Sequence, residues 1–139
     1  MIMKDKFNGW LLLGDAAVLT AFVLAGLRTH EVTQPLIRFV VNAGPILLMW
    51  LVVGLSLRVF SLPQPITLRV AWARTLNTWL IAAPLALVVR ALMLKAATIV
   101  VIFLLVTLGL GGGVMLLWRA LFVWAARRGY NPAPKDQPA

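Results

Sequence analysis

The sequence predicts an all-α integral membrane bundle of four transmembrane helices with both termini in the cytoplasm. Of its 139 residues, 62% are hydrophobic and only 12% are charged, which is too little polar surface for a soluble domain of this size. Four apolar runs are each long enough to cross the hydrocarbon core of a bilayer, which is roughly 30 Å thick. We expect helices at residues 7–27, 36–60, 68–90 and 96–123, within one domain of residues 1–126.

Three short connections separate these runs. The first ends at Pro35, which a helix tolerates in its first turn, and the second contains Pro63 and Pro65, which cannot continue a helix. The third must lie between Arg90 and Lys95, the only charges between two apolar runs, and we expect a tight helical turn there. Residues 127–139 are predicted to form a basic, then proline-rich, extended tail.

The distribution of basic residues predicts the orientation. Four spans place the N-terminus, the second connection and the C-terminus on one side, and the more basic side of a membrane protein faces the cytoplasm. The cytoplasmic side would hold nine cations: Lys4, Lys6, Arg58, Arg69, Arg74, Arg119, Arg127, Arg128 and Lys135. The other side would hold four, Arg28, Arg38, Arg90 and Lys95. We therefore expect a multi-pass protein of the bacterial cytoplasmic (inner) membrane.

Composition excludes several function classes. The net charge of +9 comes from cations at the ends of apolar runs, without the basic patch between aromatic residues that is typical of nucleic-acid binding. Cysteine is absent, which excludes thiolate metal sites and cysteine nucleophiles. The two serines lack a suitably placed base, so a hydrolase triad is not expected. We therefore predict no enzyme activity, no metal site and no cofactor.

Asp15 is the sharpest single signal, because an ionisable group inside a span is costly and marks either an ion pathway or a pairing. One interpretation is a structural pair with Arg74 or Arg119, which are predicted to lie toward the same side of the membrane. The other is a carboxyl that carries a proton or a cation. A proton carrier needs a carboxyl without a permanent arginine partner.

Other features indicate helix packing inside the membrane. Small residues recur every three or four positions in the first helix, and glycines cluster in the fourth, which favours close helix approach. Asn42 precedes Pro45, so we expect a kink at which the Asn42 side chain satisfies the Val41 carbonyl. Asn77 is expected to bond across to another helix. The predicted packing positions are Gly14, Ala17, Ala21, Gly109 and Gly113.

Arg28, His30, Arg38 and Arg90 are expected near the opposite membrane surface, with Asn42 one turn below Arg38. Three arginines around a kinked helix form a possible site for an anionic headgroup, a carboxylate or a phosphate. The simpler interpretation is that they mark the membrane boundary. His30 has charged neighbours, which favours a surface role over axial ligation of haem or chlorophyll.

Several short motifs resemble one bacterial family, catalogued as domain of unknown function 3054. The resemblance covers most of the chain from about residue 12 to 119 and implies a four-helix membrane protein without an assigned activity. The motifs that carry it are Gly14-Asp15, Gly26 with Arg28 and His30, Arg38 with Pro45 and Trp50, Trp79 with Pro84 and Arg90, and Trp118-Arg119. In that family a turn rich in glycine or proline is expected before the fourth helix, where this chain has Met93-Leu94-Lys95-Ala96.

The leading functional prediction is a non-enzymatic accessory, assembly or scaffold subunit that packs on a larger membrane complex. It follows from the absence of a catalytic constellation and from the small-residue stripes. Membrane lipids with anionic headgroups and other membrane-protein subunits are the expected partners. The alternative is a small proton-coupled carrier that uses Asp15, a layout that small four-helix multidrug exporters share.

Overall fold

The protein is described by a computed structural model that covers residues 6–28, 34–62, 66–96 and 101–129. Four helical spans are long and apolar enough to cross a membrane, as the sequence predicts. They are α1 (Gly9–Arg28), α2 (Pro35–Ser56), α3 (Leu68–Met93) and a fourth span of three consecutive elements. These elements are α4 (Val101–Val106), the π-helical segment η1 (Thr107–Gly111) and α5 (Gly112–Gly129).

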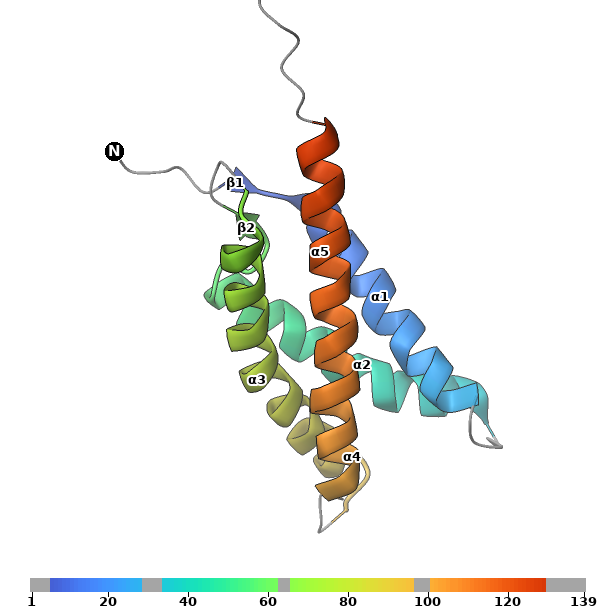
Figure 1. The fold of residues 1–139 in the computed structure, drawn as a ribbon. Helices are drawn as coiled ribbons and strands as arrows, with labels where there is room; N and C mark the ends of the chain where they lie inside the picture. The colour runs from blue at the N-terminus through green and yellow to red at the C-terminus, as the bar shows by residue number, and fades with distance from the viewer. Residues whose placement is uncertain (1–5, 29–33, 63–65, 97–100, 130–139) are drawn as a thin grey trace, which may run out of the picture.

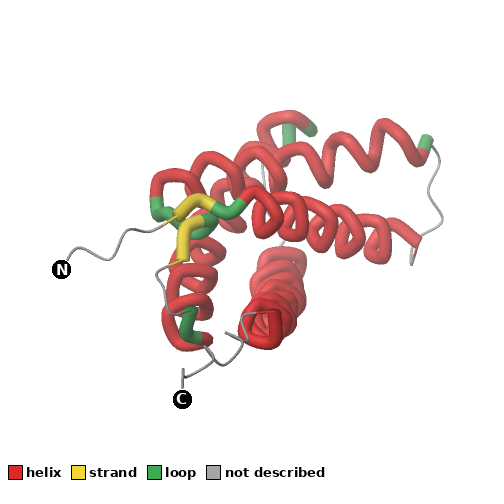
Figure 2. Tube along the Cα trace, turned by 90° about the horizontal axis from the view of Figure 1, so that it is seen from above, coloured by secondary structure: helices red, strands yellow, loops and turns green. Residues whose placement is uncertain are grey.

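The helices form a closed ring in which each contacts the next in sequence and α5 returns to contact α1 (Figure 1). Consecutive spans run in opposite directions, so the start of α1 and the end of α5 lie at the same end of the bundle (Figure 1). Seen from above, α5 is nearly end-on, whereas α1 and α2 run together to one side (Figure 2). The four-helix architecture is confirmed, and its orientation in the membrane stays a prediction.

Side chains cap the starts of two helices. The Asn8 Oδ1 atom accepts from the backbone N–H groups of Trp10 and Leu11, at 3.0 and 3.2 Å. At the start of α3, the Thr67 hydroxyl accepts from the Val70 N–H at 3.4 Å. Such caps satisfy N–H groups that have no partner within the helix.

Helix α2 ends at Ser56, four residues before the predicted end. Arg58 takes a left-handed conformation with φ 54°, while the Val59 N–H donates to the Gly54 carbonyl at 2.9 Å. This 6→1 bond, with a left-handed residue just past the helix, is the Schellman arrangement. Val59 and Phe60 then fold back over Gly54, where an added Cβ would overlap both side chains. Arginine at a position that usually holds glycine conceals this helix end in the sequence.

A short strand pair, which the sequence analysis missed, follows this turn. Strand β2 (Ser61–Leu62) pairs antiparallel with β1 (Lys6–Phe7) at the end of the bundle where the chain enters α1. The Asn8 N–H adds a bond to the Phe60 carbonyl at 2.9 Å, and the Phe7 and Phe60 rings meet edge to face. The strand pair ties the segment before α1 to the connection between α2 and α3.

The described part of the third connection, residues 94–96, is a turn without glycine or proline that begins later than predicted. Helix α3 runs to Met93 rather than residue 90, and Lys95 adopts a left-handed φ of 51°. The Ala96 N–H donates to the Ala91 carbonyl at 2.9 Å, which repeats the arrangement at the end of α2. Residue 96 is therefore outside a helix, where the fourth helix was predicted to begin.

The fourth span is longer at its other end than the predicted limit of residue 123. Helix α5 continues to Gly129, so Arg127 and Arg128 lie in its last turn. Arg128 stacks on the Trp124 ring, with 3.8 Å between its guanidinium carbon and the ring centroid. The predicted extended tail falls mostly in residues 130–139, which are outside the described part of the chain.

The core is rich in tryptophan. The buried rings of Trp50 and Trp79 lie 5.8 Å apart between centroids, in an edge-to-face arrangement. Trp79 packs on Gly111 and Gly112, where a Cβ would lie 2.5 Å and 3.1 Å from its ring. Its indole N–H donates to the Leu108 carbonyl at 3.2 Å, inside the π-helical segment η1. The expected close backbone contact of the fourth helix is thus made at these two glycines.

Candidate functional site: a buried carboxylate between three helices

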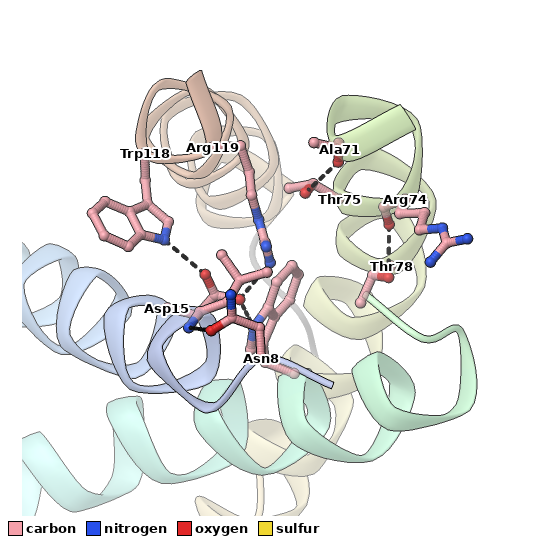
Figure 3. Close-up of polar contacts among 10 residues, drawn as sticks. Asn8, Asp15, Ala71, Arg74, Thr75, Thr78, Trp118 and Arg119 are labelled. Carbon is pink, nitrogen blue, oxygen red and sulfur yellow. Dashed lines mark hydrogen bonds and ion pairs between the residues drawn. The ribbon is translucent and has the colours of Figure 1, made fainter. Parts of the chain in front are cut away.

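Asp15 of α1 is fully buried and accepts hydrogen bonds from two neighbouring helices (Figure 3). Its Oδ2 atom accepts from the Trp50 indole of α2 at 3.0 Å and from the Arg119 Nη2 of α5 at 2.5 Å. Its Oδ1 atom accepts from the Trp118 indole of α5 at 2.8 Å. We call these four residues the Asp15 cluster. The carboxylate therefore joins α1 to both of its neighbours in the ring.

Arg119 is the charge partner of Asp15, and both side chains are fully buried. The structure thereby selects Arg119 from the two partners that the sequence left open. Its Nε and Nη1 atoms have no hydrogen-bond partner among the described residues. Burying an ion pair costs desolvation free energy, and removing either partner leaves the other as an uncompensated buried charge. Asp15 is thus the single anion that balances this buried guanidinium in the described part of the chain.

Gly14 allows the Trp118 indole to reach the carboxylate. A Cβ at residue 14 would overlap the Trp118 ring, so no larger residue fits between α1 and α5 at this level. Trp118 also packs against Phe122, one turn along α5. The adjacent residues Gly14 and Asp15 therefore act together, one making room for the donor and the other accepting from it.

Two buried threonines on α3 add to the polar part of the core (Figure 3). The Thr75 hydroxyl donates to the Ala71 carbonyl, and the Thr78 hydroxyl donates to the Arg74 carbonyl, both at 2.8 Å. A bond to the carbonyl four residues back satisfies the hydroxyl within its own helix. These threonines therefore form no bond to the carboxylate.

Arg74 and Asn77, the other predicted polar residues on α3, lie apart from the Asp15 cluster. The Arg74 Nη1 atom donates to the carbonyls of Arg58, at 3.3 Å, and of Ser61, and so holds the turn that follows α2. Asn77 is exposed on the outer surface of α3, whereas the sequence analysis predicted that it would bond across to another helix. It shares this face of α3 with the exposed Ala73 and Leu80, four residues before it and three after it.

Among the predicted packing positions, Gly14 lies in a tight contact within the bundle. Gly109 and Gly113 are exposed, and a Cβ at either would meet no atom within 4 Å. Ala17 and Ala21 of α1 are exposed as well. Within the bundle, the role assigned to Gly109 and Gly113 belongs to Gly111 and Gly112, which pack on Trp79.

The predicted outer group is brought together in part, at the end of the bundle where α3 stops and α2 starts. The Arg90 Nε donates to the Asn42 Oδ1 at 2.7 Å, and the Asn42 Nδ2 donates to the Arg38 carbonyl at 2.7 Å. Asn42 thus caps the Arg38 carbonyl instead of the predicted Val41 carbonyl. Arg28 is exposed at the end of α1, and His30 lies outside the described residues.

Two members of the Asp15 cluster, Trp50 and Trp118, were missed as functional residues. Trp118 is partly buried, whereas Trp10, Trp72 and Trp124 are exposed. The signal that was missed is the depth of the Trp50 indole in the membrane, because Trp50 lies within α2, away from the headgroups. A buried indole N–H needs a hydrogen-bond acceptor. Asp15 was the strongest acceptor available.

The chemistry open to the Asp15 cluster is limited by its contacts. Three donors occupy the two carboxylate oxygens, and within the described ranges no three His, Cys, Asp or Glu residues are grouped as a metal site would require. The arrangement is suited to fixing three helices relative to one another.

Residues 12–122 match the model of a family described as "Protein of unknown function (DUF3054)". The matched region includes the whole Asp15 cluster. No curated protein and no solved structure matches the chain at a significant level.

Proposed function

The chain belongs to the DUF3054 family of proteins of unknown function, and from its contacts we propose that it is a non-enzymatic scaffold or accessory subunit. In this role it keeps a fixed shape in the membrane and packs on a larger membrane-protein partner. The carrying observation is that the buried carboxylate Asp15 is committed to three donors from α2 and α5. The one described carboxylate is thus used to hold the bundle together.

The same contacts disfavour the alternative, a proton-coupled carrier. A carrier carboxyl must release and regain a proton or cation in each cycle, which requires that its contacts break and re-form. Here one partner is a fully buried arginine, and breaking the pair would leave that charge uncompensated. Carrier activity would therefore cost the bundle its central contact in every cycle.

The outward small residues support a role in assembly. Gly109 and Gly113 are spaced four apart on the exposed side of the fourth span, with open space around each. This spacing allows another transmembrane helix to approach the backbone closely, since no side chain intervenes. The Ala17 and Ala21 positions offer a similar surface on α1.

The proposed location is the bacterial cytoplasmic membrane, with both termini inside. Four spans assign nine of the cations in the sequence to the side of the termini and four to the other side, and the more basic side faces the cytoplasm. Cysteines introduced at Thr33 and Gln137 should react with an impermeant thiol reagent from opposite faces of the membrane. Labelling of both from one face would refute this topology.

Co-assembly in the native membrane tests the proposed function. A tagged protein should be extracted in mild detergent as part of a larger complex of defined stoichiometry. Gly113→Leu should release it from that complex, because the side chain blocks close helix approach, while its melting temperature stays unchanged. Ala125→Leu is the matched control, since it adds equal bulk at another exposed position of α5. A monodisperse 15.3 kDa monomer from native membranes would contradict the proposal.

A direct assay separates the two functions. Proteoliposomes that hold the purified protein should show no proton flux driven by an imposed gradient of candidate cations. Flux that Asp15→Asn abolishes in a variant that still folds would establish the carrier instead.

A further inference from the structure

The end of the bundle opposite the termini carries a second polar cluster, formed by Arg38 and Asn42 of α2, Arg90 of α3 and Phe103 of α4. Asn42 links the Arg90 side chain to the backbone of α2, because its side chain accepts from the Arg90 Nε and donates to the Arg38 carbonyl. The guanidinium carbon of Arg90 lies 4.8 Å from the centroid of the Phe103 ring. We call this group the Arg90 cluster.

These contacts hold the Arg90 side chain in one position. Its Nε atom donates to Asn42 and its guanidinium carbon lies over the Phe103 ring, so residues of two other helices restrain the Arg90 side chain of α3. Neither Nη atom has an acceptor among the residues that the structure describes. A guanidinium held by Nε presents its two Nη donors as a fork, which matches two oxygens of a phosphate. Because the fork is already fixed, less side-chain entropy is lost on binding.

The charge of the Arg90 cluster is unbalanced. Arg38 lies one turn nearer the helix start than Asn42 on the same face of α2, so its positive charge is on the side of the helix that contacts Arg90. Asp15 is the only carboxylate in the described segments, and it is paired with Arg119. Two cations that repel one another attract an external anion.

The surroundings indicate which anion fits. Arg90 lies in the last turn of α3 and Arg38 in the first turns of α2, so both sit where the spans meet the headgroup level. Large apolar side chains next to the cluster are exposed, namely Leu36, Ile37, Leu92 and Met93. A phosphate that arrives with acyl chains would contact both the cations and these apolar groups, whereas a free phosphate would contact only the cations.

We propose that Arg38 and Arg90 bind the phosphate of an anionic phospholipid, with Asn42 and Phe103 as residues that position the Arg90 guanidinium. The lipid's acyl chains lie along the exposed apolar side chains at the ends of α2 and α3. This site is separate from the Asp15 cluster and does not depend on the proposed scaffold function.

Lipid titration of the purified full-length protein tests the site. Phosphatidylglycerol is added to delipidated protein in detergent, and bound lipid is counted by native mass spectrometry. Arg90→Gln should weaken binding of the first lipid about tenfold, because a charge-assisted hydrogen-bond pair is lost. Arg90→Lys keeps the charge without the fork and should still weaken it several-fold. Arg69→Gln, at an exposed arginine near the other end of α3, should change it less than about twofold.

Two further arms distinguish the sources of the anion. Phosphatidylcholine should bind at least about tenfold more weakly than phosphatidylglycerol, and millimolar inorganic phosphate should not displace the bound lipid. Displacement by phosphate would overturn the lipid assignment in favour of a soluble anion.

Glu31→Gln tests whether a carboxylate of the chain itself occupies the site. This variant should bind phosphatidylglycerol with an affinity within about twofold of wild type. A tenfold gain in affinity would overturn the proposal, because it would show that Glu31 competes with the lipid.

A folding control keeps the result interpretable. Each variant should melt within about 5 °C of wild type in the absence of lipid, since Arg90 is only half-buried and its replacement removes a hydrogen bond at the edge of the bundle. Equal losses of binding in Arg90→Gln and Arg69→Gln would overturn the proposal, because the lipid would then be responding to overall charge.

Discussion

Each of the two polar clusters of this membrane protein is built around an arginine, but the surroundings of the two arginines are opposite. In the Asp15 cluster, a fully buried arginine meets a carboxylate, and two indoles complete the set of donors. In the Arg90 cluster, an asparagine and a phenylalanine hold a half-buried arginine, and the described residues supply no anion. In the Asp15 cluster the two charges balance one another within the protein, whereas the Arg90 cluster carries positive charge that no described carboxylate balances. An arginine in a membrane protein thus serves structure when the chain supplies its anion and recognition when it does not.

The largest expected effect is that of Asp15→Asn. This change removes the carboxylate charge that is paired with the buried Arg119 guanidinium and should lower the free energy of unfolding by roughly 3–5 kcal/mol. Thermal or denaturant unfolding in mild detergent measures it. Arg119→Gln in the same chain should restore part of the loss, because it removes the unpaired charge.

Arg74→Gln provides the contrast for this rescue. Arg74 donates to backbone carbonyls near the end of α2, so its effect should add to that of Asp15→Asn without restoring stability. A rescue by Arg74→Gln equal to that by Arg119→Gln would refute the assigned pairing.

Trp50→Phe should have the next largest effect. It keeps most of the aromatic volume but removes the indole donor to Asp15, a hydrogen bond to a charged group that contributes about 1.5–3 kcal/mol. Trp10→Phe is the control, because Trp10 is exposed and its indole forms no bond to the cluster. Chemical unfolding of both variants should separate them clearly, and equal midpoints would show that the indole donor adds nothing.

Gly14→Ala should destabilise the bundle by about 1–3 kcal/mol. The added methyl group overlaps the Trp118 ring and forces the indole away from the carboxylate. Gly44→Ala in α2 meets no atom within 4 Å and should instead gain about 0.5–1 kcal/mol from helix propensity. Opposite shifts in melting temperature are the expected result, and a neutral Gly14→Ala would remove the argument for close approach at this position.

Asn42→Ala is expected to have the smallest effect on stability, about 0.5–1.5 kcal/mol, because it removes hydrogen bonds at the edge of the bundle. Its effect on the Arg90 cluster should be larger, since the guanidinium loses one of its two supports. Native mass spectrometry should show weaker phosphatidylglycerol binding although both arginines remain. Unchanged lipid affinity would mean that Asn42 does not position Arg90.

Much of the fold follows from sequence patterns, whereas the partner of each polar group does not. The four spans are visible as long apolar runs, and Asp15 is recognisable because a carboxylate there is costly. The choice between Arg74 and Arg119 depends on how α3 and α5 rotate about their axes, which no local pattern specifies. The ends of α2 and α3 were also misplaced, because Arg58 and Lys95 occupy left-handed positions where glycine is the usual signal.

The glycines of the fourth span show the same limit. Spacing alone identified Gly109 and Gly113, but the backbone contact with Trp79 is made by Gly111 and Gly112. The π-helical segment at residues 107–111 changes which residues face the core, and a regular helical period does not anticipate it. More of the Arg90 cluster was predicted, since Arg38, Asn42 and Arg90 were all expected at one end of the bundle.

One crossed measurement tests the contrast between the clusters most directly: the melting temperature of Arg119→Gln and Arg90→Gln proteins, each with and without phosphatidylglycerol. Arg119→Gln should melt well below wild type without lipid, because Asp15 loses its partner, yet should gain as much as wild type when lipid is added. Arg90→Gln should lose much less stability than Arg119→Gln without lipid, and it should lose most of the lipid-induced gain. If both variants lost the same stability and the same lipid response, the division into a structural and a recognition arginine would be wrong.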